Sequence, residues 1–281
     1  MIVKKVSWVL LAWVVASFSI AYATDLPDMK EKGIINFAVY KNFPPYSYTE
    51  SGKLVGIDVD IAKKVAEKLQ LKPLIRTIGA DENVEDDLRN NVWKGHYLGG
   101  GVADVMLHAP YDREYSEEVD QVKFLSPYQL ESIVFAIDTK KLGKQPTVAN
   151  FTYDKIGVEV DTLSDFYLLS TLGGKIRPNV VHYFSVTEAM QALQKGEVAA
   201  VMGPRGEIEG AMQKTPDHLV SMRLVTPGLS KTSWAIGMAV KQRRPQLAAA
   251  VDQAMAQLTH DGSIASIFKS YGVSYISPAA P

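Results

Sequence analysis

Residues 83–113, together with the two positions before them, contain the side chains whose types could do chemistry. Five carboxylates gather there, at Asp81, Glu82, Glu85, Asp86 and Asp87, and two histidines, His96 and His108, follow. Carboxylates could bind a cation, but the run lacks the alternating oxygen ligands of a calcium loop. None of the five histidines has a metal-ligand spacing. Acidic residues favour the first turn of a helix, so the run predicts a helix start, and no metal site is predicted.

The familiar catalytic motifs are missing from the sequence. There is no Gly-x-Ser-x-Gly elbow, and Gly99–Gly101 is not followed by the Lys-Ser/Thr of a phosphate loop. The chain has no cysteine, which excludes thiol nucleophiles, iron–sulfur centres and cysteine zinc sites. Its formal net charge of -1 comes without a basic patch, so a nucleic-acid partner is not expected. The sequence predicts no catalytic residue, no cofactor and no enzyme.

Aromatic side chains accompany this stretch and one earlier loop. Trp93, Tyr97 and Tyr111 could form an apolar patch at the mouth of a cleft, either for a segment of a partner or as ordinary core. Phe43 and Tyr46, in a loop stiffened by two prolines, could form a wall of the same cleft. The aromatic residues therefore predict a cleft rim near residues 83–113.

Alternating strands and helices must position these groups. The pattern predicts a helix from about Asn83 to Gly95 and a strand over 103–107 that ends in a polar loop at 109–113. Further strands are expected at residues 34–40, 74–78, 156–160, 180–183, 198–202 and 234–240. Asp58 or Asp60 is placed to cap the helix after Gly56, and residues 185–188 read as a capping box. Strand–helix alternation of this kind predicts α/β domains.

Length and the N-terminus indicate a secreted protein of two domains. The 281 residues suffice for two ordinary domains. Lys4 and Lys5 precede an apolar run at 6–20 and a small-x-small site at 21–23, which together predict a signal peptide over residues 1–23. A single membrane anchor is the alternative. We expect a periplasmic protein without membrane anchoring in its mature form.

Several segments together resemble the type II periplasmic solute-binding proteins of the amino-acid-binding group, family 3. The segments are 43–46, 56–62, 124–128, 258–262 and 269–272. The resemblance implies an α/β fold of two lobes, two α/β domains joined by two crossing hinge strands near residues 128–132 and 230–237. Lobe 1 would be discontinuous, comprising 24–128 and 236–281, and lobe 2 would comprise 129–235. A ligand would lie in the cleft between them.

The positions that grip an amino acid in that family are altered here. The family usually carries Thr-x-x-Arg after the strand matching 103–107; Arg113 is in place, but the threonine is not. Asp161 stands before Thr162 where the family has a glycine at a helix start that binds the ligand carboxylate. Pro204 replaces the amine-binding aspartate, and Arg205 and Glu207 would lie on the facing lobe. An ordinary amino-acid ligand is therefore not expected.

A closer resemblance covers residues 83–108. The run from Asn83 to Tyr97, with Gly99–Gly101 and the strand that ends at His108, is similar to the J proteins of methanol dehydrogenase clusters, MxaJ and XoxJ. It implies a periplasmic accessory protein of a methylotroph's methanol oxidation system, which aids maturation or activation of a PQQ-dependent methanol dehydrogenase through protein–protein contact. The dehydrogenase and its cytochrome c would be the partners. The alternative is an ABC-transporter receptor for a small ligand other than an amino acid.

The candidates for a ligand- or partner-binding cleft come from all of these segments. They are Phe43, Tyr46, Trp93, Tyr97, His108, Tyr111, Arg113, Asp161, Thr162 and Arg205.

Overall fold

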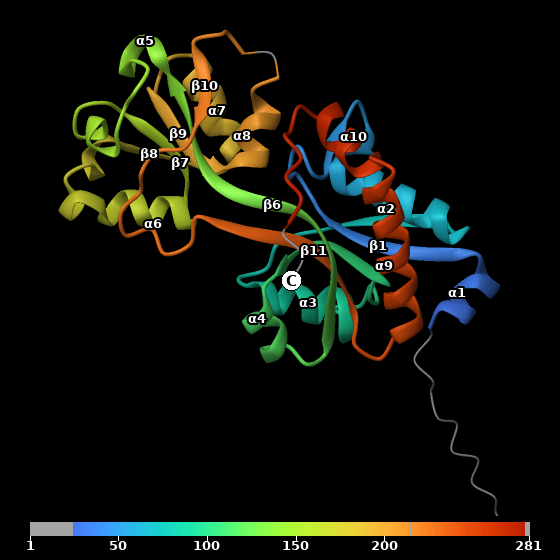
Figure 1. The fold of residues 1–281 in the computed structure, drawn as a ribbon. Coiled ribbons are helices and arrows are strands. Elements are labelled where there is room, and N and C mark those ends of the chain that lie inside the picture. Colours follow the sequence, from blue (N-terminus) through green and yellow to red (C-terminus); the bar gives the residue numbers. More distant parts are fainter. Residues whose placement is uncertain (1–24, 214, 279–281) are drawn as a thin grey trace, which may run out of the picture.

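The computed structural model describes residues 25–213 and 215–278. The predicted signal peptide, residues 1–23, lies outside this part of the chain. Two α/β lobes lie side by side, joined by two strands that cross between them (Figure 1). The predicted two-lobed α/β fold is confirmed.

Lobe 1 is built on a mixed sheet whose order is β4-β1-β5-β11-β6. Its own strands are β1 (Ile34–Tyr40), β4 (Lys72–Ile78) and β5 (Val105–Tyr111), with a small hairpin of β2 (Tyr48–Glu50) and β3 (Lys53–Val55). β1 pairs in parallel with both β4 and β5. β1 is an almost continuously apolar strand, as is typical of parallel strands covered on both faces, and its residues 37–39 are fully buried between β4 and β5.

Helices cover both faces of this sheet. On one face lie α2 (Ile57–Leu69), α9 (Pro245–His260) and α10 (Ser263–Ser270), so the C-terminal helices pack with the first half of the chain. The other face carries α3 (Val84–Leu88) and the one-turn π-helix η1 (Arg89–Trp93), whose Leu88 and Val92 are fully buried. The short helices α1 (Leu26–Lys32) and α4 (Arg113–Glu118) lie at the periphery of the lobe.

Lobe 2 repeats the architecture with shorter elements. Its strands are β7 (Ile156–Glu159), β8 (Val180–Tyr183), β9 (Ala200–Pro204) and β10 (Leu219–Met222), and its helices are α5 (Thr139–Leu142), α6 (Leu163–Ser170), α7 (Val186–Gln194) and α8 (Arg205–Ala211). Short 3-10 turns lie at Val148–Thr152, Thr171–Gly174 and Arg177–Asn179. Ser185 caps α7 by accepting from the Glu188 N–H, which confirms the predicted cap; the Glu188 carboxylate accepts from the Phe184 N–H and not from that of Ser185, as a full capping box would require. Apolar clusters fill both faces of this second sheet.

The strands β6 (Val122–Asp138) and β11 (Ser233–Lys241) connect the lobes. β6 pairs with β11 as far as Ser132, and from Ile133 onward it pairs with β9. A single strand therefore belongs to both sheets. The space between the lobes lies beside this crossing.

Two local predictions are corrected by the packing. The helix after Gly56 has no side-chain cap, because Asp58 is fully buried and accepts a 2.7 Å hydrogen bond from the Tyr128 hydroxyl instead. The strand expected to end at Leu107 continues to Tyr111, because Ala109, Pro110 and Tyr111 pair with β11. Residues 109–111, predicted as part of a polar loop, thus form a strand that pairs with β11, which lies far along the chain.

Candidate functional site

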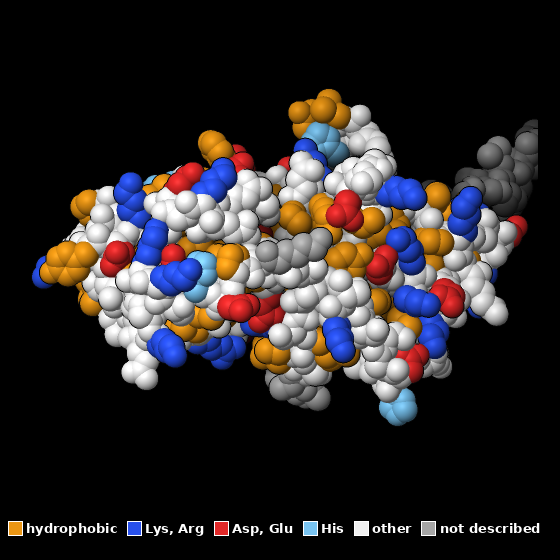
Figure 2. Space-filling model, turned by 90° about the horizontal axis from the view of Figure 1, so that it is seen from above, with side chains coloured by type: hydrophobic (Ala, Val, Ile, Leu, Met, Phe, Trp, Pro, Cys, Tyr) orange, Lys and Arg blue, Asp and Glu red, His pale blue; other side chains and the backbone are white. Residues whose placement is uncertain are grey.

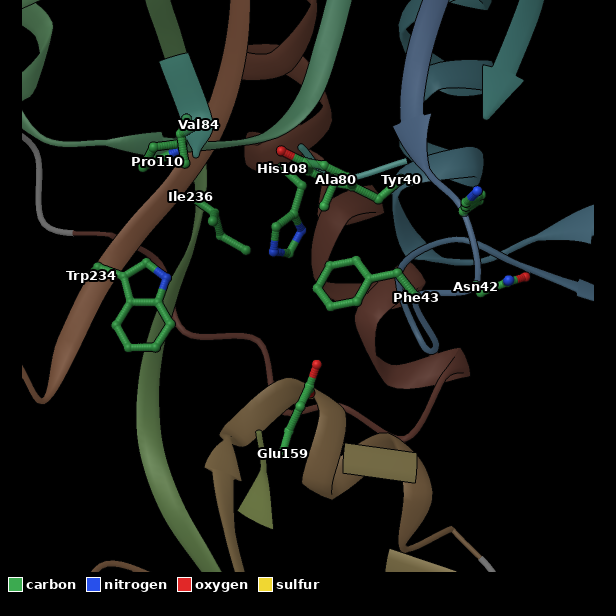
Figure 3. A pocket seen from close by; sticks show the side chains of 11 residues that line it. Tyr40, Asn42, Phe43, Ala80, Val84, His108, Pro110, Glu159, Trp234 and Ile236 are labelled. Carbon is green, nitrogen blue, oxygen red and sulfur yellow. The ribbon is translucent and has the colours of Figure 1, made fainter. Parts of the chain in front are cut away.

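A cavity of about 450 Å³ lies between the lobes. Its lining comprises Tyr40, Lys41, Asn42, Phe43, Ala80, Val84, His108, Pro110, Glu159, Trp234 and Ile236. Figure 3 shows Phe43 and His108 reaching into the space from lobe 1, Trp234 beside it, and Glu159 rising from the opposite lobe. The cavity has the size and the mainly apolar walls of a small-molecule pocket.

His108 is the centre of the lobe 1 wall. Its backbone adopts the left-handed region with φ 58°, and its N–H donates to the Tyr128 hydroxyl at 3.0 Å. Its Nδ1 lies 3.3 Å from a carboxylate oxygen of the buried Asp58. The ring is enclosed by Phe43 and Tyr46, whose centroids lie 4.7 and 4.3 Å away. The sequence-predicted candidates Phe43, Tyr46 and His108 are thus brought together.

The lobe 2 wall is acidic. Glu159 ends β7, and its Oε2 accepts from the Val186 N–H at 3.2 Å, at the start of α7. Burial raises the pKa of Glu159, although the Val186 hydrogen bond opposes the shift. Burial, and then the charges of Glu159 and Glu131, raise the pKa of Glu207 well above its ordinary value. Glu159 is thus the carboxyl group that lobe 2 contributes to the cavity lining, with Glu207 near it outside the lining.

The helix start after β7, where the family would hold a carboxylate, is satisfied by the chain itself. The Asp161 N–H donates to Asp165 at 3.0 Å, and the Thr162 hydroxyl accepts from the Asp165 N–H at 3.3 Å. At α8 the Gly206 N–H donates to Glu131 at 3.1 Å. Donors that a ligand carboxylate would need are therefore committed to internal acceptors.

Arg205 was expected on the cleft wall and lies elsewhere. It is buried, and its guanidinium donates to the Ser274 carbonyl at 2.6 Å and to the Leu130 carbonyl at 2.9 Å. It also pairs with Glu209 at 3.3 Å. Arg205 therefore ties lobe 2 to the hinge strand and to the C-terminal segment.

The aromatic patch predicted from Trp93, Tyr97 and Tyr111 is divided in the structure. Trp93 and Tyr111 are partly buried and pack against the same apolar cluster of lobe 1, which includes Leu88 and Val92. Tyr97 is 87% exposed and its neighbour Leu98 is 78% exposed. None of the three lines the cavity. The side chain of Arg113 is not among those that the structure describes.

Of the residues that line the cavity, the sequence predicted only Phe43 and His108 as cleft candidates. Those that it missed include Tyr40, Glu159 and Trp234. Tyr40 and Glu159 are the last residues of β1 and β7. Ligand groups in open α/β sheets gather at such strand ends, so a polar residue closing an apolar strand was the available signal. Trp234 gave no such signal, because its place depends on how β11 crosses between the lobes.

Residues 35–93 match the profile of "Bacterial extracellular solute-binding proteins, family 3". In structure, the chain is similar to an ancestral cationic amino acid solute binding protein (AncCDT-1), with a TM-score of 0.70 and 17% identity over 88% of this chain and 99% of that one. The fold is that of the type II periplasmic solute-binding proteins. An arginine-binding protein from T. maritima, in its P235GK mutant form, has a TM-score of 0.60 and 21% identity, covering 88% of this chain and 98% of its own.

Relatives with assigned roles are distant in sequence. The L-cystine-binding protein TcyJ of Escherichia coli K12 is 23% identical over 249 residues, 88% of this chain and 85% of that protein. The ABC transporter arginine-binding protein 1 of the same strain is 25% identical over 237 residues, 83% of this chain and 88% of its own. The chain thus spans most of the length of these solute-binding relatives.

Two features were not found in the part of the chain that the structure describes. Among residues 25–213 and 215–278 no three histidine, aspartate or glutamate side chains converge as metal ligands. Over the same part of the chain, no helix combines the length and apolar character that a bilayer crossing needs.

Proposed function

We propose that this chain is a periplasmic accessory protein that uses a solute-binding fold to contact a protein partner, a PQQ-dependent methanol dehydrogenase and its cytochrome c. The proposal rests on one observation: the groups that would bind an amino acid are already hydrogen-bonded within the chain. The N–H groups of Asp161 and Gly206 have internal carboxylate acceptors, and Arg205 is turned into the hinge. A buried anion without donors is strongly disfavoured, so an amino-acid carboxylate would bind poorly.

The loop at residues 95–101 supports contact with a protein. It projects from the segment that resembles the J proteins and presents Tyr97 and Leu98 to solvent. Arg76 holds the loop by donating to the carbonyls of Gly100 and Gly101, each at 3.0 Å, and the His96 ring lies 4.4 Å from that of Tyr97. Hydrophobic side chains are also visible as separate groups on the surface, one of which projects beside a histidine (Figure 2). Tyrosine is among the residue types that most often anchor protein interfaces.

A binding measurement with purified dehydrogenase tests the proposal. We expect the mature protein to bind the dehydrogenase, and the double substitution Tyr97→Ser with Leu98→Ser to weaken binding about tenfold or more. Tyr153→Ser is the matched control, since Tyr153 is an equally exposed aromatic residue of lobe 2. Absence of binding, together with no effect of the protein on dehydrogenase maturation in cells, would refute the proposed function.

A receptor for a small solute of an ABC transporter is the second candidate. It is supported by the cavity and by the names of the relatives, which bind cystine or arginine. A solute at a hundredfold its dissociation constant should stabilise the protein by about 2.7 kcal/mol, so a thermal-shift screen separates the candidates. Neighbouring genes for a permease and an ATPase would favour the receptor, whereas genes for a quinoprotein and a cytochrome would favour the accessory role.

We also infer that the protein binds and does not catalyse. The relatives named above are binding proteins, although one similar structure is described as a precursor of cyclohexadienyl dehydratase. The fold by itself therefore does not decide the matter. Incubation of the purified protein with candidate solutes, followed by analysis for new products, tests this inference.

A further inference from the structure

The proposed contact with a partner protein does not involve the cavity between the lobes, so the residues that line this cavity need an explanation of their own. Its lobe 1 side presents the rings of Tyr40 and Phe43, and the hinge strand adds Trp234. Glu159 faces them from lobe 2 across the space, as Figure 3 shows. Aromatic faces attract cations, and a carboxylate on the opposite side can act as a counter-ion, so this arrangement favours a positively charged ligand.

The aromatic wall is held in place by its own contacts. Phe43 stacks on Tyr46 with a centroid distance of 5.1 Å and meets Tyr40 edge-on at 6.1 Å. The Tyr40 hydroxyl donates to Asp87 at 2.7 Å, and that of Tyr46 donates to Glu131 at 2.7 Å. The rings are therefore positioned before any ligand arrives, which reduces the entropy lost on binding.

The charges around the cavity favour a cation. Glu159 is the acidic residue that lobe 2 contributes to the lining, and it lies near enough to Glu207 to help raise the pKa of that second carboxyl group. The basic residues on the lobe 1 side of the lining are Lys41, whose side chain is exposed, and His108, whose Nδ1 lies 3.3 Å from the buried Asp58. Lobe 2 brings no lysine or arginine to the described lining.

We propose that this cavity binds a small organic cation, an ammonium or guanidinium compound without a carboxylate. The faces of Phe43 and Trp234 would contact the cation, and Glu159 would be its counter-ion. The N–H groups of Asp161 and Gly206 already donate to Asp165 and Glu131, so these two helix starts offer no donor to the carboxylate that a cationic amino acid would add. This inference does not depend on the partner contact, which involves a loop outside the cavity.

Calorimetry on the mature protein tests the inference with four defined probes. Choline is compared with its neutral isostere 3,3-dimethylbutan-1-ol, and agmatine with L-arginine, which adds a carboxylate. We expect at least one cation to bind, and its neutral or carboxylated counterpart to bind about tenfold more weakly or worse, a difference of about 1.4 kcal/mol. Quenching of Trp234 fluorescence should accompany binding.

Substitutions locate the site. Glu159→Gln keeps an acceptor for the Val186 N–H and should weaken cation binding about tenfold. Phe43→Leu, which keeps an apolar side chain but removes the ring, should weaken it as well. Glu197→Gln removes an exposed acid of lobe 2 outside the lining and should have no effect. Equal affinity for choline and its neutral isostere, unchanged affinity in Glu159→Gln, or no binding of either cation at millimolar concentration would overturn the inference.

Discussion

The hydroxyl of Tyr46 donates a 2.7 Å hydrogen bond to Oε2 of Glu131, which joins the aromatic loop of lobe 1 to the strand that crosses into lobe 2. Glu131 is buried and also accepts from the Gly206 N–H, at the start of α8. A Cβ at Gly206 would lie 2.0 Å from the Tyr46 hydroxyl, so only glycine permits this approach. These three residues fix the two lobes to their hinge.

Tyr46→Phe removes one hydrogen bond from this buried carboxylate. We expect the free energy of unfolding to fall by about 1.5–3 kcal/mol, since hydrogen bonds to charged groups contribute that much. Urea unfolding followed by circular dichroism measures the loss. Tyr153→Phe, at an exposed tyrosine, should change stability by less than about 0.5 kcal/mol. Equal stability of the two variants would contradict the role given to Tyr46.

The pair Arg244–Asp104 lies inside lobe 1, where Asp104 also accepts two hydrogen bonds from Asn36. Arg244→Met should destabilise the protein by about 3–5 kcal/mol, because it leaves Asp104 buried without its main counter-charge. Lys231→Met breaks an exposed pair with Asp112 and should cost at most about 1 kcal/mol. Thermal unfolding of both variants checks the contrast, and a similar shift in the two would refute it.

Trp93 and Tyr97 belong to the same predicted patch, yet their truncation should affect the free energy of unfolding very differently. Trp93→Ala should cost about 2–4 kcal/mol, since its ring packs against the lobe 1 core. Tyr97→Ala should alter stability by less than about 0.5 kcal/mol, because the side chain is exposed. Denaturant midpoints of both variants provide the test. A stable Trp93→Ala would mean that the indole belongs to a surface patch after all.

Glu207 should make stability depend on pH. Its pKa is raised in the folded protein from the ordinary value of 4.5, so above that pH the unfolded chain loses its proton first. The folded state then binds more protons than the unfolded one, and the free energy of unfolding falls as pH rises. Glu207→Gln removes this loss, so it should stabilise the protein near neutral pH.

The same substitution supplies its own control at low pH. Below 4.5 the carboxyl group is protonated in both states, and Glu207→Gln should then have little effect. Unfolding curves for wild type and variant across this range are the measurement. A gain in stability that is equal at every pH would indicate a packing effect instead of titration.

The sequence predicted those features that depend on local pattern. Alternating apolar strands and amphipathic helices required α/β lobes, and Ser185 with Glu188 predicted the start of α7, because helix caps involve residues three positions apart. The altered grip positions Asp161 and Pro204 were also visible without a structure. The internal hydrogen bonds that now occupy the N–H groups of Asp161 and Gly206 could not be predicted, because they depend on which side chains the fold brings near.

Only the tertiary structure decided which side chains share the cavity. Glu159 and Trp234 are separated by most of lobe 2 in the sequence, and they meet because β6 and β11 cross between the sheets. Arg205 turned toward the hinge because the carbonyls of Leu130 and Ser274 lie within its reach. Residues 109–111 became a strand because β11 offered them partners. Strand pairing over long sequence separations follows from global packing, and no local pattern of residues encodes it.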